Sequence, residues 1–184
     1  MRLQKPRVPL LPQAEWNDEI RSVLEPISKN GMLYNIFRTL ARHIKGLKRW
    51  TVFANHVLYK STLSPRDREI LILRIGWLCD AEYEWGQHVQ IGKRAGLTDD
   101  EIQRIGAGPN APGWSEHDRA LLRATDELHR DAFLSDATWA ALGQRYNTEQ
   151  LIDVVFTVGN YNLVSMMLNT LGVQLDEGIP GYRK

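Results

Sequence analysis

The apolar positions of the chain recur at helical spacing in one segment after another. In segment 16–24 they are three or four residues apart, and Pro26 ends the pattern. The same spacing continues through segment 32–59, which predicts two helices separated near Gly46. Strand-like alternation is not convincing anywhere, although VVFTV near the C-terminus is rich in β-branched residues. The pattern predicts an all-α fold.

Residues that favour helix ends divide the middle of the chain. Ser64 followed by Pro65 is typical of a helix N-terminus. The residues that follow, 69–78, are apolar almost all round, which predicts a helix buried on most sides. We expect Asp80 to cap the next helix and Gly96 to end it.

Polar caps predict further helices in the C-terminal half. The predicted caps are Thr98 with its capping-box partner Glu101, Ser115, Ser135, and Asn147 or Thr148 before a last apolar helix that reaches about Leu171. We therefore expect about seven to nine helices in one domain over residues 1–184, with an irregular arm at 1–15. Segments 69–88 and 150–169 begin apolar and end at a polar residue at the same separation, so a duplication into two degenerate halves stays open.

Composition narrows the function classes. The 184 residues carry a net charge of +1, with 23 basic and 22 acidic residues mixed along the chain, which argues against a nucleic-acid partner. No apolar run approaches the ~20 residues that cross a bilayer, and the N-terminus lacks the apolar stretch of a secretory signal. We expect no membrane partner and a cytoplasmic location.

The chain contains a single cysteine, Cys79. One cysteine excludes an internal disulfide, a CxxC redox pair, and a zinc or iron–sulfur site built from several cysteines. The histidines show no HxxxH or HExxH spacing, and no phosphate loop, nucleophile elbow or dinucleotide fingerprint is present. We therefore expect neither a metal nor a cofactor.

Candidate chemistry concentrates in the segment EILILRIGWLCDAEYEWGQHVQ, residues 69–90. Glu84 and His88 are four apart on one predicted helix, so their side chains lie on the same face and can touch. They border the apolar stripe of that helix, where a pocket wall is expected. Glu69 is the one carboxylate at the head of an otherwise apolar helix, so a partly buried acid is expected there. We take these three residues as the candidate catalytic group.

Each candidate also has a simpler interpretation. A Glu–His pair four residues apart is a frequent surface contact, worth only ~0.2–0.5 kcal/mol. Glu69 could be a first-turn acid that interacts with the helix dipole. Tyr83, Trp85 and His56 are candidates for substrate binding, but residues of these types in helices more often pack in a core or an interface.

The motif Y-E-W-x-x-H, followed by AGLTDDEI, resembles the carboxymuconolactone decarboxylase family, which also contains the AhpD-like alkylhydroperoxidases. The resemblance is strong over residues 63–105. It implies an AhpD-like helical bundle and a homo-oligomer, commonly a trimer or hexamer, with sites near subunit contacts. In the peroxidase branch a glutamate, a CxxC pair and a histidine form the site, and Glu69 and His88 take the first and last of these places.

The two cysteine positions of the peroxidase branch are occupied here by Ala81 and Glu84. Neither residue supplies a thiolate, and Cys79 lies two residues too early, so peroxidase activity is disfavoured. The decarboxylase branch places a glutamate four residues before the histidine, as Glu84 and His88 stand here. The resemblance thus implies a cofactor-independent decarboxylase or lyase that acts on a small organic acid or lactone, such as a carboxymuconolactone, by general acid–base chemistry. A non-catalytic oligomeric binding protein remains an alternative.

Overall fold

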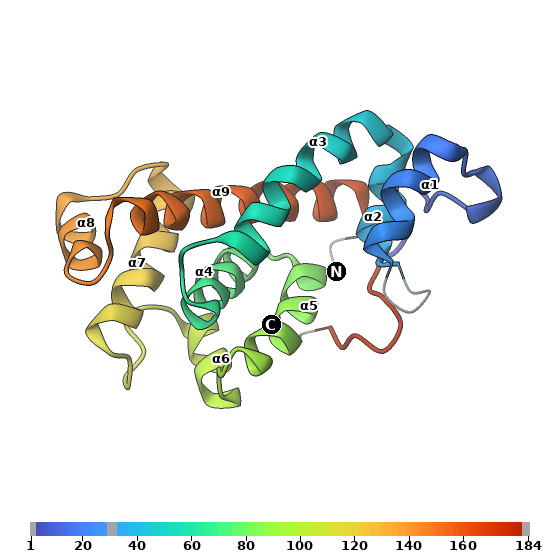
Figure 1. Cartoon of the computed structure of the whole chain (residues 1–184). Coiled ribbons are helices and arrows are strands. Elements are labelled where there is room, and N and C mark those ends of the chain that lie inside the picture. The colour runs from blue at the N-terminus through green and yellow to red at the C-terminus, as the bar shows by residue number, and fades with distance from the viewer. Residues whose placement is uncertain (1–2, 29–32, 182–184) are drawn as a thin grey trace.

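The computed structural model describes residues 3–28 and 33–181, and within them it contains helices and irregular segments only (Figure 1). The predicted all-α class is confirmed. The α-helices are α1 (Asp18–Leu24), α2 (Asn35–Leu40), α3 (Ile44–Asn55), α4 (Pro65–Leu78), α5 (Glu82–Arg94), α6 (Asp99–Ala107), α7 (Glu116–Asp131), α8 (Asp136–Gly143) and α9 (Thr148–Leu171). Short 3-10 turns lie at Gln13–Glu15, Glu25–Ile27 and Ala41–His43, and the π-helical turn η4 spans His56–Lys60.

Helix α4 is the centre of the fold. It packs against α5, α6, α7 and α9, and its residues from Glu69 to Gly76 are all buried. The Ser64 side chain accepts a hydrogen bond from the Asp67 backbone N–H, and Pro65 occupies the first turn. An apolar helix that is surrounded on all sides forces any polar residue on it to find a partner within the fold.

Helix α9 runs along the length of the molecule (Figure 1). Asn147 and Gln150 form a capping box at its start, and Gly172 in the left-handed region ends it with φ 71°. By length and composition α9 would suffice to cross a membrane, but 56% of its most apolar window is buried inside the fold. A core helix has the same properties, so its apolar character serves packing against α4, α5, α7 and α8.

A second, smaller apolar cluster holds the N-terminal helices together. It consists of Leu11, Ile20, Leu24, Ala41 and Leu47. The arm before it follows the protein surface, where the backbone N–H of Arg7 donates to the carbonyl of Leu171 at 2.9 Å. The arm therefore ties the N-terminus to the end of α9.

The break between α2 and α3 lies at Ala41–His43, so the prediction of a break near Gly46 is wrong. Gly46 lies in the first turn of α3, where a Cβ would approach Cδ2 of His43 to 2.9 Å. Because Gly46 has no side chain, the His43 ring can lie close to the backbone of α3. The first residue of the predicted segment, Met32, lies outside the described residues.

The prediction that Asp80 caps α5 is also wrong. The N-cap is Ala81, which has no side-chain hydrogen bond to offer. Asp80 is instead a left-handed residue, with φ 54°, in the tight turn between α4 and α5. The other predicted caps are confirmed: Ser64, Thr98, Ser115, Ser135 and Asn147 each accept a backbone hydrogen bond at a helix start.

Candidate active site at the contact of α4 and α5

The structure brings Glu69, Glu84 and His88 together where α4 packs against α5. Glu84 and His88 are one turn apart on α5, and Glu69 reaches them from the first half of α4. His88 Nδ1 hydrogen-bonds Glu69 Oε2 at 2.6 Å. His88 Nε2 lies 2.9 Å from Glu84 Oε1. Both ring nitrogens of the histidine therefore face a carboxylate.

All three side chains of this cluster are enclosed. The residues are 0%, 4% and 5% exposed for Glu69, Glu84 and His88. Burial alone would lower the pKa of His88, but the charge of Glu69, then that of Glu84, and the hydrogen bonds outweigh it and raise the pKa to about 10. The surroundings of His88 therefore favour its protonated form, an imidazolium, at neutral pH.

The two carboxylates hold His88 differently. The contact with Glu69 is an aligned hydrogen bond, and its short distance is typical of a charge-assisted one. The contact with Glu84 is an ion pair, because Glu84 Oε1 is buried without a hydrogen-bond partner. Glu69 thus fixes the orientation of the ring, and Glu84 places a second carboxyl group beside Nε2.

Two further side chains border the cluster. Arg68 places Nε and Nη2 each 3.2 Å from Glu69 Oε1, the oxygen that His88 does not use. Tyr161 on α9 sets its ring edge-on to the imidazole, with centroids 4.9 Å apart and an interplanar angle of 82°. Burial, and then the charges of Glu84 and Glu69, raise the pKa of the Tyr161 phenol well above its ordinary value, so it stays neutral.

Tyr83, a predicted substrate contact, lies elsewhere on α5. Its hydroxyl donates to Asp176 Oδ2 and accepts from the backbone N–H of Ile36. Asp176 also accepts from Gln87 Nε2 at 2.7 Å and from the backbone N–H of Asn35 at 2.8 Å. In this chain Tyr83 therefore anchors the segment after α9 to the start of α2.

Trp85 and His56 are likewise not brought to the cluster. Trp85 packs its ring against Trp77, with centroids 5.0 Å apart, in the main core. His56 Nε2 lies 2.9 Å from Asp153 Oδ1 on α9. Substrate roles for these residues stay predictions.

A small surface recess lies beside α5 and the end of α9. Its lining is Leu3, Glu82, Tyr83, Leu168, Asn169, Gly172 and Val173. Tyr83 is thus the one predicted substrate contact that borders it. The recess does not include the residues of the Glu69–His88–Glu84 cluster, so it supplies no path from solvent to His88.

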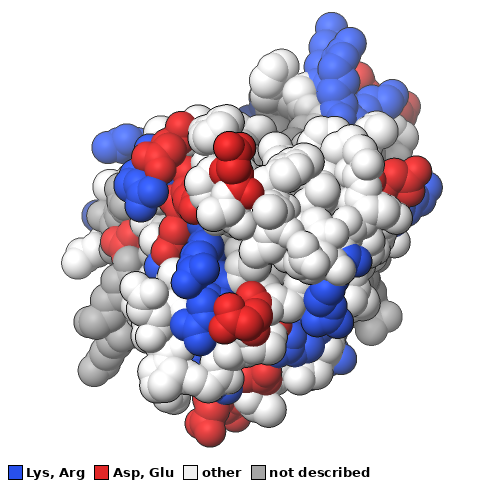
Figure 2. All heavy atoms as spheres, turned by 90° about the vertical axis from the view of Figure 1, so that its left-hand side faces the viewer, with Lys and Arg blue, Asp and Glu red and all other residues white. Residues whose placement is uncertain are grey.

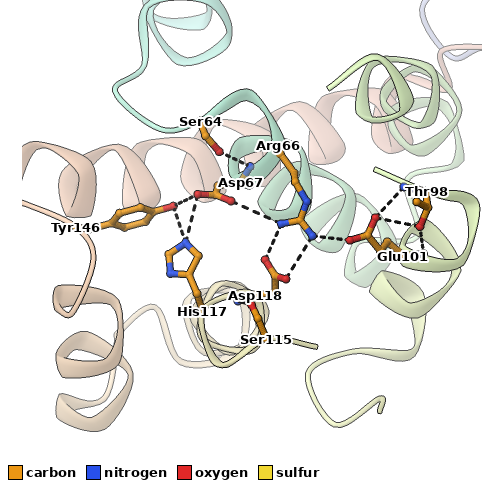
Figure 3. A network of polar contacts seen from close by, with 9 residues as sticks. All are labelled: Ser64, Arg66, Asp67, Thr98, Glu101, Ser115, His117, Asp118 and Tyr146. Carbon is orange, nitrogen blue, oxygen red and sulfur yellow. Dashed lines mark hydrogen bonds and ion pairs between the residues drawn. The ribbon is translucent and has the colours of Figure 1, made fainter. Parts of the chain in front are cut away.

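Sequence reasoning missed a second polar network, which surrounds the first turn of α4 (Figure 3). Asp67 Oδ2 accepts from the Tyr146 hydroxyl at 2.7 Å and lies 3.3 Å from His117 Nε2. The Tyr146 oxygen is also 3.2 Å from the same nitrogen. Burial would raise the pKa of Asp67, but the hydrogen bonds from His117 and Tyr146 outweigh it and lower the pKa.

The same network continues through Arg66 to α6 and α7 (Figure 3). The Arg66 guanidinium donates to Asp118 Oδ1 at 2.7 Å and to Glu101 Oε1 at 2.6 Å. These hydrogen bonds raise the pKa of Arg66. A signal was available in the sequence at Glu101 and Asp118, which sit in the first turns of helices with predicted caps, but nothing local links them to Arg66.

In the described part of the chain, no cluster of side chains is suited to metal binding or to thiol–disulfide chemistry. No group of three or more His, Cys, Asp or Glu side chains there is placed to hold a metal ion. The Cys79 sulfur lies 3.1 Å from Asn162 Oδ1 and 3.8 Å from His129 Nδ1. On the face drawn in Figure 2, acidic and basic side chains are interspersed.

Residues 45–127 match the profile of the Carboxymuconolactone decarboxylase family. The match runs from α3 into α7 and includes the cluster of Glu69, Glu84 and His88. The resemblance predicted from the motif is confirmed, and the single cysteine agrees with a relative that lacks the CxxC pair. No curated protein sequence matches the chain.

Solved structures share the fold. An uncharacterized peroxidase-related protein with an alkylhydroperoxidase AhpD core, from Ralstonia eutropha JMP134, superposes with TM-score 0.82 at 19% identity, over 95% of this chain and 94% of that chain. A peroxidase-related protein from Silicibacter sp. TM1040 superposes with TM-score 0.79 at 17% identity, over 96% of this chain and 97% of that chain. The debrominase Bmp8 in complex with 2,3,4-tribromopyrrole superposes with TM-score 0.75 at 13% identity, over 95% of this chain and 94% of that chain. At these identities the likeness shows the AhpD-like fold alone.

Proposed function

From the family profile of residues 45–127 and the geometry around His88, we propose that this protein is a cofactor-independent lyase. It decarboxylates a small organic acid or lactone of the carboxymuconolactone type by general acid–base chemistry. The observation that carries the proposal is the buried ring of His88, held between the carboxyl groups of Glu69 and Glu84. A proton donor held in a fixed orientation is what such a reaction needs from the protein.

In the proposed reaction the C–C bond to the substrate carboxylate breaks and carbon dioxide leaves. The electron pair stays on the substrate as a dienolate, delocalised into its carbonyl. His88 Nε2 then gives its proton to carbon, and the imidazole is reprotonated from solvent before the next turnover. Glu69 holds Nδ1 throughout, and Glu84 favours the charged form of the ring before transfer.

The experiment compares carbon dioxide release from a panel of unsaturated lactone acids and β-keto acids by three proteins. We expect the parent protein to turn over at least one of these acids and His88→Gln to lose at least 100-fold, in the range of a general acid contribution of ~10²–10⁴. His117→Gln is the matched control, because His117 is also a buried histidine paired with a carboxylate. Equal activity of His88→Gln and the parent would overturn the assignment.

A hydroperoxide reductase is the weaker alternative. Its thiol–disulfide step needs an attacking and a resolving cysteine, whereas positions 81 and 84 at the start of α5 hold alanine and glutamate. We expect no peroxide turnover with a thiol donor. Turnover that disappears in Cys79→Ser would favour this alternative over the lyase.

A non-catalytic binding protein is favoured by one observation, the enclosure of the cluster. His88 is 5% exposed, and the surface recess lies elsewhere. In that case Glu84 and His88 only hold α5 against α4. A panel in which no acid is turned over, together with a large loss of stability in His88→Gln, would support this reading.

We propose a homo-oligomer as the working form, supported by an apolar outer face on α3, η4 and α9. Eight large apolar side chains there are 37–73% exposed: Val52, Phe53, Tyr59, Ile152, Val155, Phe156, Leu163 and Met166. Phe53 and Phe156 pack edge-on at 5.2 Å, which joins the two helices into one face. At about 100 Å² each, they expose roughly one partner's ~800 Å² share of a standard interface.

The expected partner of this face is a second copy of the chain, and light scattering coupled to gel filtration tests it. The double variant Phe156→Glu and Leu163→Glu should shift the parent oligomer to monomer. Phe133→Glu is the control, since Phe133 is 66% exposed outside this face. A monomeric parent that instead binds lipid vesicles would contradict the proposal and place α9 against a membrane.

A further inference from the structure

Arg68 adopts an unusual position beside the cluster. Neighbouring residues on a helix point in different directions, and an arginine at a helix start ordinarily extends into water. Here the guanidinium of Arg68 turns to the carboxylate of the next residue, Glu69, and the Arg68 side chain is only 11% exposed. Arginine is rarely buried to this degree unless it is paired.

The groups around Glu69 come from three helices. Arg68 lies on its own helix, His88 and Glu84 face it from α5, and from α9 the neutral phenol of Tyr161 completes the surroundings. With His88 charged, the buried set holds two positive and two negative groups. The net charge is zero, as a buried cluster requires.

The remaining basic residues of α4 do not serve the cluster. Arg66 bonds Asp118 on α7 and Glu101 on α6. Arg74 forms a bidentate pair with Asp126 on α7, with contacts of 2.6 and 3.0 Å. Among the described basic residues of α4, Arg68 is therefore the one that balances Glu69.

We propose that Arg68 is a positioning residue that keeps Glu69 ionised and aimed at His88, so that the only proton the buried cluster can give up is the one on the imidazolium. By engaging Oε1, the guanidinium leaves Oε2 to His88 Nδ1. The inference deepens the proposed function, since it explains how an acid of defined charge is maintained beside two carboxylates. It does not require Arg68 to touch a substrate.

Removal of the guanidinium should change how many protons the cluster binds. Without Arg68 the three remaining charges sum to −1 in a buried site. A buried unpaired charge is costly, and the group takes up a proton instead. We expect Arg68→Gln to bind about one more proton near neutral pH than the parent, on a carboxylate of the cluster.

Carbon-13 NMR of the glutamate carboxyl carbons over a pH series measures this directly. In Arg68→Gln one glutamate carboxyl should titrate well above the ordinary midpoint of ~4.3. Arg68→Lys should restore the parent titration in part, because an ammonium returns the charge without the two-nitrogen geometry. Arg66→Gln is the matched control: it removes the same charge from the same turn of α4, and should leave the carboxyls of Glu69 and Glu84 unchanged.

Two results would overturn the inference. One is an Arg68→Gln protein that folds and shows no added titrating carboxyl. The other is an equal change in the Arg66→Gln control. The titration needs no substrate, so the inference can fail while the lyase activity stands, and it can hold if no acid is decarboxylated. If Arg68→Gln does not fold, Arg68→Lys gives the test, since a titration identical to that of the parent would show that the two-nitrogen geometry at residue 68 does not matter.

Discussion

Two histidine–carboxylate contacts begin two residues apart on α4 and differ in character. Asp67 and Glu69 are separated by about 200° around the helix axis, so they point to opposite sides. Asp67 meets His117 from α7, and Glu69 meets His88 from α5. The same pair of residue types therefore occurs twice on the same turn of one helix.

The difference between the two contacts lies in what completes them. His88 has a carboxylate on each nitrogen, and Glu69 is fully buried with Arg68 behind it. His117 shares one carboxylate with the hydroxyl of Tyr146, and its Nδ1 is buried without a partner. The two carboxyl groups favour the protonated form of the first histidine. The second contact is a junction that fastens α4 to α7 and, through Tyr146, to the connection between α8 and α9.

The largest expected effect is a difference in the free energy of unfolding between variants of Glu69 and of Asp67. Glu69→Gln should lower the free energy of unfolding at pH 7 by about 3–5 kcal/mol, because it leaves Arg68 buried without its partner. Asp67→Asn should cost about 1–3 kcal/mol, since hydrogen bonding to Tyr146 is partly kept. Urea unfolding of both variants measures the difference. Equal losses would mean that the Glu69 cluster is no more strongly coupled than the junction.

The pH dependence of stability tests the charge of His88. The pKa of His88 is raised to about 10 in the folded state, so its contribution is full below the unfolded value of ~6.5 and is lost as the pH rises through about 10. Relative to His88→Gln, the parent should lose several kcal/mol of stability over that range. Thermal unfolding from pH 6 to 10 tests this. A stability difference that stays constant across the series would show that His88 gains no proton on folding.

The smallest effect is expected at the junction. Tyr146→Phe removes the hydroxyl that donates to Asp67 but keeps the ring packed against His117. The loss should be about 1 kcal/mol, the net value of one hydrogen bond. Urea unfolding again provides the measurement, and a loss as large as that of Glu69→Gln would make the junction the dominant polar contact of α4.

Local sequence was enough to predict the part of the site that lies on one helix. The spacing of Glu84 and His88 places them on one face, and the apolar run after Pro65 predicts the buried helix that carries Glu69. Asp80 shows where local sequence is not enough. Aspartate is favoured both as a helix N-cap and in a turn with positive φ, so the residue type alone does not tell which of the two forms.

The junction could not be predicted in the same way. Asp67 and Tyr146 are 79 positions apart in sequence. Their contact depends on how α7 and the connection between α8 and α9 meet α4, which is set by packing between helices and leaves no local pattern. The role of Arg68 was missed for a related reason. Its partner is the next residue, Glu69, and adjacent residues on a helix are not expected to pair.

The central claim is that His88 is a buried imidazolium at neutral pH, and a titration of nitrogen-15-labelled histidine side chains tests it most directly. His88→Gln identifies its signals. We expect both His88 nitrogens to be protonated from pH 6 to 8 and to lose a proton with a midpoint of about 10. A midpoint near 6.5, with one bare nitrogen at pH 8, would contradict the account, because the two carboxylates would then not hold the proton that the proposed reaction uses.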